Sequence, residues 1–418
     1  MTAPGTGEDL GAPPSARSTV VIVVENLPVP LDRRVWQEAR ALRDRGHEVI
    51  VICPRMRGYT APEEELEGIR IYRHWIAGEA SGTAGFLAEY ASALLGEGRL
   101  LWKAWRRHRF RVLHLSNPPD LLFLVAWPWK LRGVRVVYDV HDLWPEMFEA
   151  KFARRGLLYG LVRLAERATH ACADIVLATN ESVRAVALGR GHKPEADVFV
   201  VRTAPSWPAA AGTDALATAP AGPIDAALRK GRRFLVGYVG VMGNADGVAY
   251  LLDAAAHLVG AHGRRDIQFL LMGTGPEHAR LVEQRDRLGL ADFVDLPGRV
   301  SDELLFTALR TMDLGVACDP INEYNHHCTM NKVLEYMAFG KAQVMFDLRE
   351  GRASAGDAAR YVATNSAVEL ARAIAELLAD EAARERMGRL GAERLRELLS
   401  WERSVAELYR AYDRATGS

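Results

Sequence analysis

The sequence predicts an α/β protein built from two doubly wound domains that face a central cleft. Short β-branched runs alternate with longer amphipathic stretches along most of the 418 residues. This alternation is typical of mostly parallel sheets with helices on both faces. It stops in a Pro-, Ala- and Gly-rich stretch at 206–224 and then restarts. The length also suits two domains, at about 150 residues per domain.

The first half opens with a strand–helix–strand unit. Residues 19–24 form a nearly continuous apolar run, as expected of a strand that is buried on both faces. Residues 33–45 carry apolar side chains at helical spacing, and Gly46 ends this helix before a second strand at 48–53. The same pattern predicts further strands at 111–115, 134–138, 175–178 and 198–201.

The second half repeats this organisation after the break. Strands are expected at 234–239, 267–272, 293–296, 314–318 and 343–346, with a helix at 247–259 after the first of them. Two long helices at 367–378 and 381–399 and an amphipathic segment at 401–412 close the chain. The predicted domain plan is a disordered tail at 1–18, a first domain at 19–205, a linker at 206–228, a second domain at 229–399, and a final helix at 400–418 that packs back on the first domain.

Composition excludes several classes of protein. The 53 basic residues balance the 53 acidic ones, whereas a nucleic-acid-binding protein usually carries a basic excess. The four cysteines form no C-x-x-C pair, which favours a reducing compartment. The N-terminal stretch has no apolar core, and no apolar run is long enough to span a bilayer. We therefore expect a cytoplasmic protein; the alternative is peripheral association with the inner face of the plasma membrane.

The segment 329–342 carries the strongest chemical signal. It predicts a helix that starts near Asn331 and ends at Gly340. A helix N-terminus offers free N–H groups to a phosphate, and Lys332 adds a positive charge there. Glu335 lies one turn further on, where its carboxylate can accept hydrogen bonds from a ribose diol. The alternative is an ordinary amphipathic helix with one solvated Lys and one solvated Glu.

Lys332-x-x-Glu335-Tyr-Met-Ala-x-Gly340 resembles the donor-nucleotide signature of the family-4 retaining glycosyltransferases, which have the GT-B fold of two Rossmann-like domains. Other landmarks of this family follow in the expected order: Gly46-His47-Glu48-Val49, Tyr238-Val-Gly240, Met272-Gly-x-Gly275-Pro276, Leu296-Pro-Gly298-Arg-Val300, and the ending Trp401 to Tyr412. The stretches at 24–34 and 139–146 are most similar to the branch that builds surface polysaccharides. The resemblance covers residues 19 to about 413.

The resemblance implies roles for particular residues. The catalytic set is His141 beside the sugar and the reacting centre, Lys332 near the phosphates and Glu335 on the ribose hydroxyls. The donor-binding candidates at the matching motifs are Gly273, Gly298, Arg299, Val300, Asn331, Lys332 and Glu335. To these we add Gly243, Asn244, His326 and His327, as groups that can stabilise the leaving diphosphate. From their positions in the sequence, and not from the resemblance, the acceptor-side candidates are Arg33, Asn117, Asp142 and Glu146, which follow strands or open a helix. For Asn117 the alternative is turn chemistry.

The chain departs from the family pattern at three places. An acidic residue often stands eight positions before Glu335, where this chain has His327. The Arg/Lys pair that neutralises the diphosphate is replaced by Val241 and Asp246. A Gly-Gly loop of the first domain is replaced by residues 26–30. We expect other groups to compensate, and the candidates are Lys332, the amides near Gly243 and Asn244, His326, His327 and Arg33.

These residues predict transfer of a sugar from a nucleotide-diphosphate sugar to a hydroxyl, with retention of anomeric configuration. The favoured acceptor is a lipid-linked saccharide in surface polysaccharide synthesis; the alternative is a small secondary metabolite. The sequence is also compatible with a nucleotide-sugar epimerase, a phosphorylase, or an inactive partner that only binds the donor. We expect no bound metal or cofactor, because the acids around His141 fit no standard zinc spacing. The basic, Trp-containing segment 99–111 can lie on an anionic membrane, or it can be an amphipathic helix with a buried apolar side.

Overall fold

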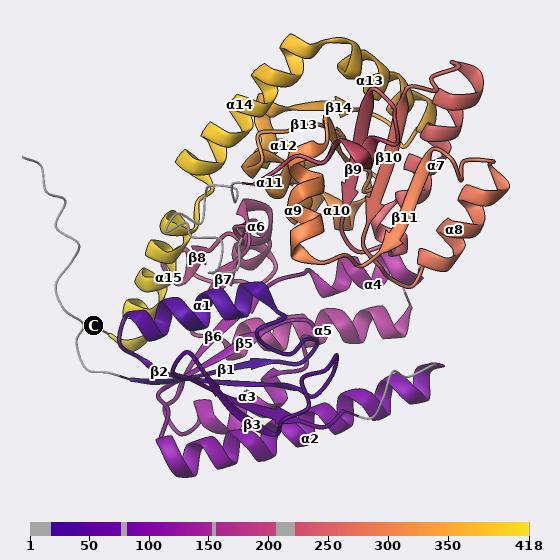
Figure 1. Cartoon of the computed structure of the whole chain (residues 1–418). Coiled ribbons are helices and arrows are strands. Elements are labelled where there is room, and N and C mark those ends of the chain that lie inside the picture. Colours follow the sequence, from indigo (N-terminus) through magenta and orange to yellow (C-terminus); the bar gives the residue numbers. More distant parts are fainter. Residues whose placement is uncertain (1–17, 77–81, 153–155, 206–221, 418) are drawn as a thin grey trace, which may run out of the picture. The chain divides into compact units, whose positions relative to one another are not determined.

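The computed structural model describes residues 18–76, 82–152, 156–205 and 222–417 (Figure 1). The predicted tail, apart from Ser18, and residues 206–221 of the predicted linker lie outside the described residues. Two sheets with flanking helices make up the fold, which confirms the predicted α/β class (Figure 1). Within the described part, no helix is both long and apolar enough to cross a bilayer.

The first sheet has eight strands in the order β3-β4-β2-β1-β5-β6-β7-β8. Its strands are β1 (Thr19–Val24), β2 (Glu48–Pro54), β3 (Glu63–Leu66), β4 (Ile69–His74), β5 (Val112–Ser116), β6 (Arg135–Val140), β7 (Ile175–Ala178) and β8 (Val198–Val200). Strand β1 pairs in parallel with β2 and with β5, and the strand order reverses between them. The edge strand β3 pairs antiparallel with β4. The helices of this half are α1 (Arg33–Asp44), α2 (Gly82–His108), α3 (Phe123–Lys130), α4 (Trp144–Phe152), α5 (Leu157–Cys172) and α6 (Glu181–Gly189).

The second sheet has six strands in the order β11-β10-β9-β12-β13-β14, and every adjacent pair is parallel. Its strands are β9 (Phe234–Val239), β10 (Ile267–Met272), β11 (Val294–Gly298), β12 (Leu314–Ala317), β13 (Ala342–Phe346) and β14 (Ala359–Val362). The helices are α7 (Val248–Ala256), α8 (His278–Arg287), α9 (Asp302–Thr311), α10 (Glu323–His327), α11 (Asn331–Ala338), α12 (Arg349–Ala355), α13 (Ala367–Ala379), α14 (Glu381–Leu398) and α15 (Trp401–Thr416). The order is that of a doubly wound sheet, in which ligands bind where the order reverses.

Alternate side chains of β10 pack into apolar clusters on opposite faces of the second sheet. Phe269 and Leu271 pack into the core that includes side chains of α7 and α13. Leu270 and Met272 point the other way, into a cluster that includes Phe306 of α9. Both faces of the strand are apolar because neither meets water, as expected for a parallel sheet.

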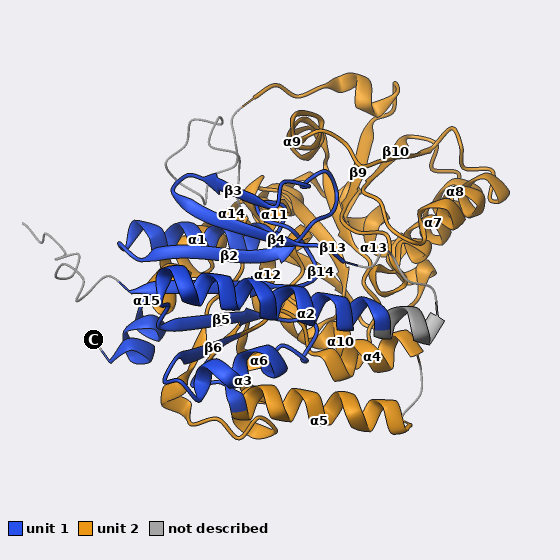
Figure 2. Cartoon of the chain, turned by 90° about the horizontal axis from the view of Figure 1, so that it is seen from below, with its two compact units in different colours: residues 1–138, 172–175, 409–418 blue, residues 139–171, 176–408 orange. Residues whose placement is uncertain are grey.

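The chain divides into two compact units (Figure 2). Unit 1 comprises Met1–Tyr138, Cys172–Ile175 and Tyr409–Ser418, and unit 2 comprises Asp139–Ala171 and Val176–Leu408. Within unit 1, the end of α15 contacts α1 and β5. Tyr409 donates a hydrogen bond to the Ala41 carbonyl at 3.0 Å, and the Tyr412 hydroxyl lies 2.8 Å from His114 Nδ1.

A buried carboxyl group in unit 1 predicts a pH-dependent stability. Burial and, secondly, the nearby Glu89 carboxylate raise the pKa of Glu25 from its ordinary 4.5 to about 8. The folded state therefore holds this proton more tightly than the unfolded state, so the contribution of Glu25 to stability falls as the pH rises from about 4.5 to about 8. We expect Glu25→Gln to be more stable than the wild type at pH 8 and to lose less stability over that range, as measured by urea unfolding. Equal slopes for the two proteins would contradict this.

Candidate active site

The loops after β9, β10 and β11 meet at the carboxyl edge of the second sheet. A Cβ atom on Gly273 would lie 1.7 Å from the Gly240 carbonyl oxygen, so the loop after β10 requires glycine at this position. The Gly273 amide donates to the Gly298 carbonyl at 2.9 Å. Two predicted donor-binding residues, Gly273 and Gly298, are thus adjacent. Arg299 is exposed beside them, and Val300 packs partly against the core.

Lys332 lies where the strand order reverses, between the ends of β9 and β12. It is the second residue of α11 and is 6% exposed. Its Nζ atom lies 2.7 Å from Asp319 Oδ1 and 3.5 Å from Asp246 Oδ1. Burial lowers the pKa of Lys332, but the carboxylates of Asp319 and Asp246 outweigh this and raise its pKa above the ordinary value. The ammonium group therefore stays charged.

Asp246, which stands where the resemblance implies a lysine, already contacts two of the predicted phosphate-binding groups. Its Oδ2 atom accepts a hydrogen bond from the Gly243 amide at 3.0 Å, and its Oδ1 atom is near Lys332. Burial raises the pKa of Asp246, Lys332 lowers it, and Asp319 raises it further. A diphosphate that binds here must compete with this carboxylate for both groups.

Asp319 completes a cluster of two carboxylates and one ammonium. It follows β12 and is 2% exposed, and its Oδ2 atom is buried without a hydrogen-bond partner. This residue was not predicted from the sequence, although an acidic side chain directly after a buried strand is a signal that could have found it. The cluster carries a formal charge of −1 while both carboxyl groups are ionised, so it does not by itself attract an anion.

The remaining predicted donor-binding residues lie on and beside α10 and α11. Asn331 is exposed at the start of α11, next to the N-terminal amides, and Glu335 is half-buried one turn later. Asn244 begins a single 3₁₀ turn directly after Gly243. The Gly243 amide donates to Asp246, and Asp246 also contacts Lys332. The roles of all three in donor binding stay predictions.

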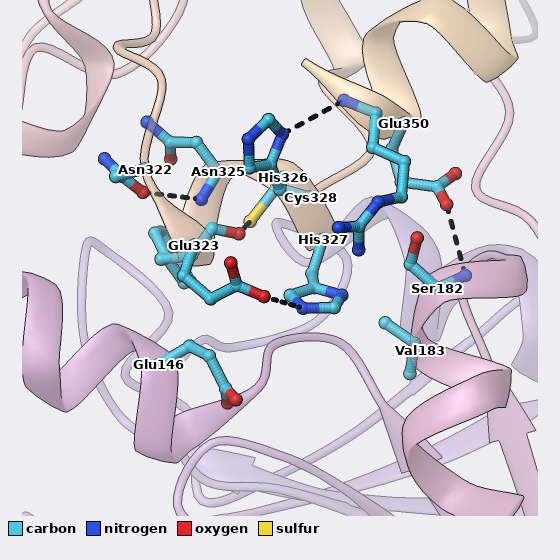
Figure 3. Close-up of polar contacts among 12 residues, drawn as sticks. Glu146, Ser182, Val183, Asn322, Glu323, Asn325, His326, His327, Cys328 and Glu350 are labelled. Atoms are coloured by element: carbon cyan, nitrogen blue, oxygen red, sulfur yellow. Dashed lines mark hydrogen bonds and ion pairs between the residues drawn. The ribbon is translucent and has the colours of Figure 1, made fainter.

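Two adjacent histidines of α10 point in different directions (Figure 3). His326 Nδ1 accepts a hydrogen bond from the Arg349 amide at 3.2 Å. His327 Nε2 lies 3.1 Å from Glu323 Oε1, whereas its Nδ1 is buried without a partner. His327 also lines a cavity of about 590 Å³ together with Ser182, Arg190, Arg349 and Glu350.

The loop after β6 carries His141, and within unit 2 it is joined to α10. His141 Nε2 lies 2.5 Å from Asp139 Oδ2, and the Asp139 side chain is fully buried. This carboxylate fixes the orientation of the imidazole. The Tyr324 hydroxyl of α10 donates to Asp142 Oδ1 at 2.9 Å. Burial raises the pKa of Asp142, and the hydrogen bond from Tyr324 opposes this effect.

Asn180 makes a second connection inside unit 2, one that was not predicted from the sequence. Its side-chain amide donates to the His327 carbonyl at 2.8 Å and to Thr329 Oγ1 at 3.0 Å, while its oxygen caps α6. Near it, Glu350 Oε1 accepts a hydrogen bond from the Ser182 amide at 3.1 Å (Figure 3). These contacts hold α6 against the segment that leads into α11.

The acceptor-side candidates are spread over both units. Glu146 forms a bidentate ion pair with Arg190, which also binds Glu166 at 2.6 Å, so this carboxylate is already engaged inside unit 2. In unit 1, Asn117 is 1% exposed and donates to Asp120 at 2.9 Å and to Tyr138 at 3.0 Å. Arg33 is exposed at the first position of α1.

Comparison with known proteins identifies the two halves of the chain. A family model described as "Glycosyl transferase 4-like domain" matches residues 31–204, and one described as "Glycosyl transferases group 1" matches residues 233–380. Together they cover more than half of the chain. No curated protein matches the sequence.

Solved structures share the fold over nearly the whole chain. Sucrose-phosphate synthase from Thermosynechococcus elongatus has a TM-score of 0.73 at 17% identity, covering 96% of this chain and 100% of that one. HepE from Anabaena, in complex with UDP and glucose, has a TM-score of 0.70 at 15% identity, with 95% and 100% covered. WaaG, a glycosyltransferase involved in lipopolysaccharide biosynthesis, has a TM-score of 0.67 at 14% identity, with 96% and 100% covered. The chain therefore belongs to the family-4 glycosyltransferases and has their GT-B fold.

Proposed function

We propose that the protein transfers a sugar from a nucleotide-diphosphate sugar to a hydroxyl group, with retention of anomeric configuration. The observation that carries this proposal is the link between Tyr324 and Asp142, which joins the His141 loop to the segment that leads into α11. Lys332 and Glu335 follow on that helix. The similar HepE has been solved with UDP-glucose, which supports a donor of this class.

In this reaction, residues of unit 2 bind the donor and stabilise the leaving group. Glu335 accepts hydrogen bonds from the ribose, and the amides at the start of α11 bind the diphosphate. Lys332 stabilises the charge that develops on the leaving diphosphate. His141, oriented by Asp139, positions the sugar. Attack from the face that the diphosphate leaves preserves the configuration, so no protein nucleophile is required.

This mechanism requires Asp246 to break two contacts. When the diphosphate binds, it must replace the Asp246 carboxylate at Lys332 and at the Gly243 amide. The same contact favours a second candidate function, a partner that binds the donor but does not transfer the sugar.

Incubation with labelled nucleotide sugars and a panel of acceptors separates these functions. A glycosylated product with the anomeric configuration of the donor supports the proposal, and activity that persists in chelator supports a metal-free reaction. Donor binding without product on every acceptor supports the inactive partner. An epimer formed from donor alone contradicts transfer as the primary activity.

For the acceptor, we propose a lipid-linked saccharide used in surface polysaccharide synthesis, with membrane contact through the segment 99–111. Leu101 of this segment is buried and Trp105 packs on Phe110, so part of the segment belongs to the core. Trp102, in contrast, is 51% exposed, and Arg106 is exposed on the same side of α2. The exposed side thus combines an aromatic ring with basic groups, as membrane-surface helices do.

Glu335→Ala tests the nucleotide site. We expect donor affinity to fall about 10- to 100-fold, because charge-assisted hydrogen bonds to the ribose are lost. The melting temperature without ligand should not change, because Glu335 is only half-buried. Calorimetric titration with the active donor measures the change, and Glu381→Ala at the exposed start of α14 is a matched control. A fully active variant would overturn the assignment.

A further inference from the structure

Helix α5, which belongs to unit 2 (Figure 2), carries a stripe of exposed leucine side chains. Leu157 is 93% exposed, Leu161 60% and Leu164 61%. Their spacing of four and three residues places them on one face of the helix. We call Leu157, Leu161 and Leu164 the leucine stripe. Leu158 is also 57% exposed, but it lies one turn before Val162 and is not part of this face.

The opposite face of α5 is anchored in the protein. Val162, Ala165, Thr169 and His170 are all buried, so the helix cannot rotate to cover its leucines without exposing these side chains. Three large apolar side chains on one outward face form a patch of the kind that marks an interaction site. A single exposed leucine would need no such explanation.

The charges on α5 favour an anionic occupant. Arg163 and Arg167 are exposed on one flank of the leucine stripe. Glu166, which is the acidic residue of this helix, is 4% exposed and bound by Arg190. The outward face therefore presents leucine and arginine without an exposed carboxylate from α5, which is the composition of helices that lie in a membrane interface.

We propose that α5 docks on an anionic lipid bilayer, with the leucine stripe inserted among the acyl chains near the headgroups and Arg163 and Arg167 at the lipid phosphates. Long arginine side chains reach polar headgroups while their stems stay apolar. A second copy of the chain fits less well. A twofold interface centred on this stripe would bring the same arginines of both copies together, and one short helix buries less area than stable dimers need.

This surface belongs to unit 2, whereas α2 belongs to unit 1. It goes beyond the proposed sugar transfer, because lipid binding requires neither donor nor acceptor. The two proposals can therefore fail independently. The loss of vesicle binding in α5 variants, in which segment 99–111 is unchanged, reports on α5, and transfer to a water-soluble acceptor without vesicles reports on the active site.

The test is vesicle flotation of the full chain with the double variant Leu161→Gln/Leu164→Gln. We expect the wild type to float with vesicles of phosphatidylcholine and phosphatidylglycerol, and the variant to bind at least about tenfold more weakly. Its melting temperature should not fall, because both side chains are exposed. The matched control Leu390→Gln/Leu398→Gln changes two exposed leucines of α14, which are 40% and 49% exposed, and should bind like the wild type.

Charge reversal tests the second half of the proposal. Arg163→Glu/Arg167→Glu should remove the preference for phosphatidylglycerol over pure phosphatidylcholine vesicles. Equal binding by the wild type and the leucine variant would overturn the proposal, as would a wild type that binds neither vesicle. A wild-type dimer that the leucine substitutions convert to a monomer would show that a second copy covers this face, and would also overturn it.

Discussion

Replacement of Lys332 by methionine is expected to lower the free energy of unfolding by about 3–5 kcal/mol, because it leaves the buried Asp319 and the half-buried Asp246 without their cation. Asp319 is 2% exposed, and its Oδ2 atom already lacks a hydrogen-bond partner. Urea unfolding of the purified chain measures the loss. In the double variant Lys332→Met/Asp319→Asn, part of the stability should return, because one of the buried charges is removed.

The same substitution should affect catalysis more than it affects donor binding. Removing one preorganised donor at a leaving group costs about 10²–10³ in turnover. Lys230→Met is a suitable control, because Lys230 also pairs with an aspartate, at 2.6 Å, but is 48% exposed in its side chain. Exposed pairs contribute about 0–1 kcal/mol. A Lys332→Met protein that is as stable as this control would contradict the ion-pair account.

Replacement of His141 by alanine should reduce turnover by about 10²–10³, through loss of a positioned polar group at the reacting centre. The imidazole is held by Asp139, at 2.5 Å, so Asp139→Asn should reduce turnover by less while leaving the ring in place. Steady-state kinetics with saturating donor measures both effects. His262→Ala, at an exposed histidine of unit 2, should behave like the wild type. If His141→Ala retained full turnover, His141 would have no role at the reacting centre.

The central strands were predictable because burial on both faces leaves a strong pattern. The predicted strands at 19–24, 234–239 and 267–272 coincide with β1, β9 and β10. The edge strand β3 was missed, because its sequence Glu-Glu-Glu-Leu carries charge where a buried strand carries apolar residues. An edge strand meets water and needs no apolar pattern.

The residues of the site were easier to predict than their partners. The motif around Lys332 and Glu335 is local, so the sequence located it on a helix that starts at Asn331, as observed. The carboxylates that hold Lys332 come from the ends of two other segments, and only the folded sheet brings them together. For the same reason the sequence identified Asp246 as a departure from the family pattern but did not predict that it binds Lys332 and the Gly243 amide.

The central claim is that the start of α11 binds a nucleotide-diphosphate sugar, and a thermal-shift titration against a panel of these donors tests it most directly. A ligand that binds the native state raises the melting temperature by an amount that grows with its concentration relative to Kd. At least one donor should raise the melting temperature of the wild type, and Glu335→Ala should lose most of that shift at the same concentration. A wild type that responds to no donor, or a variant that responds equally, would contradict the claim.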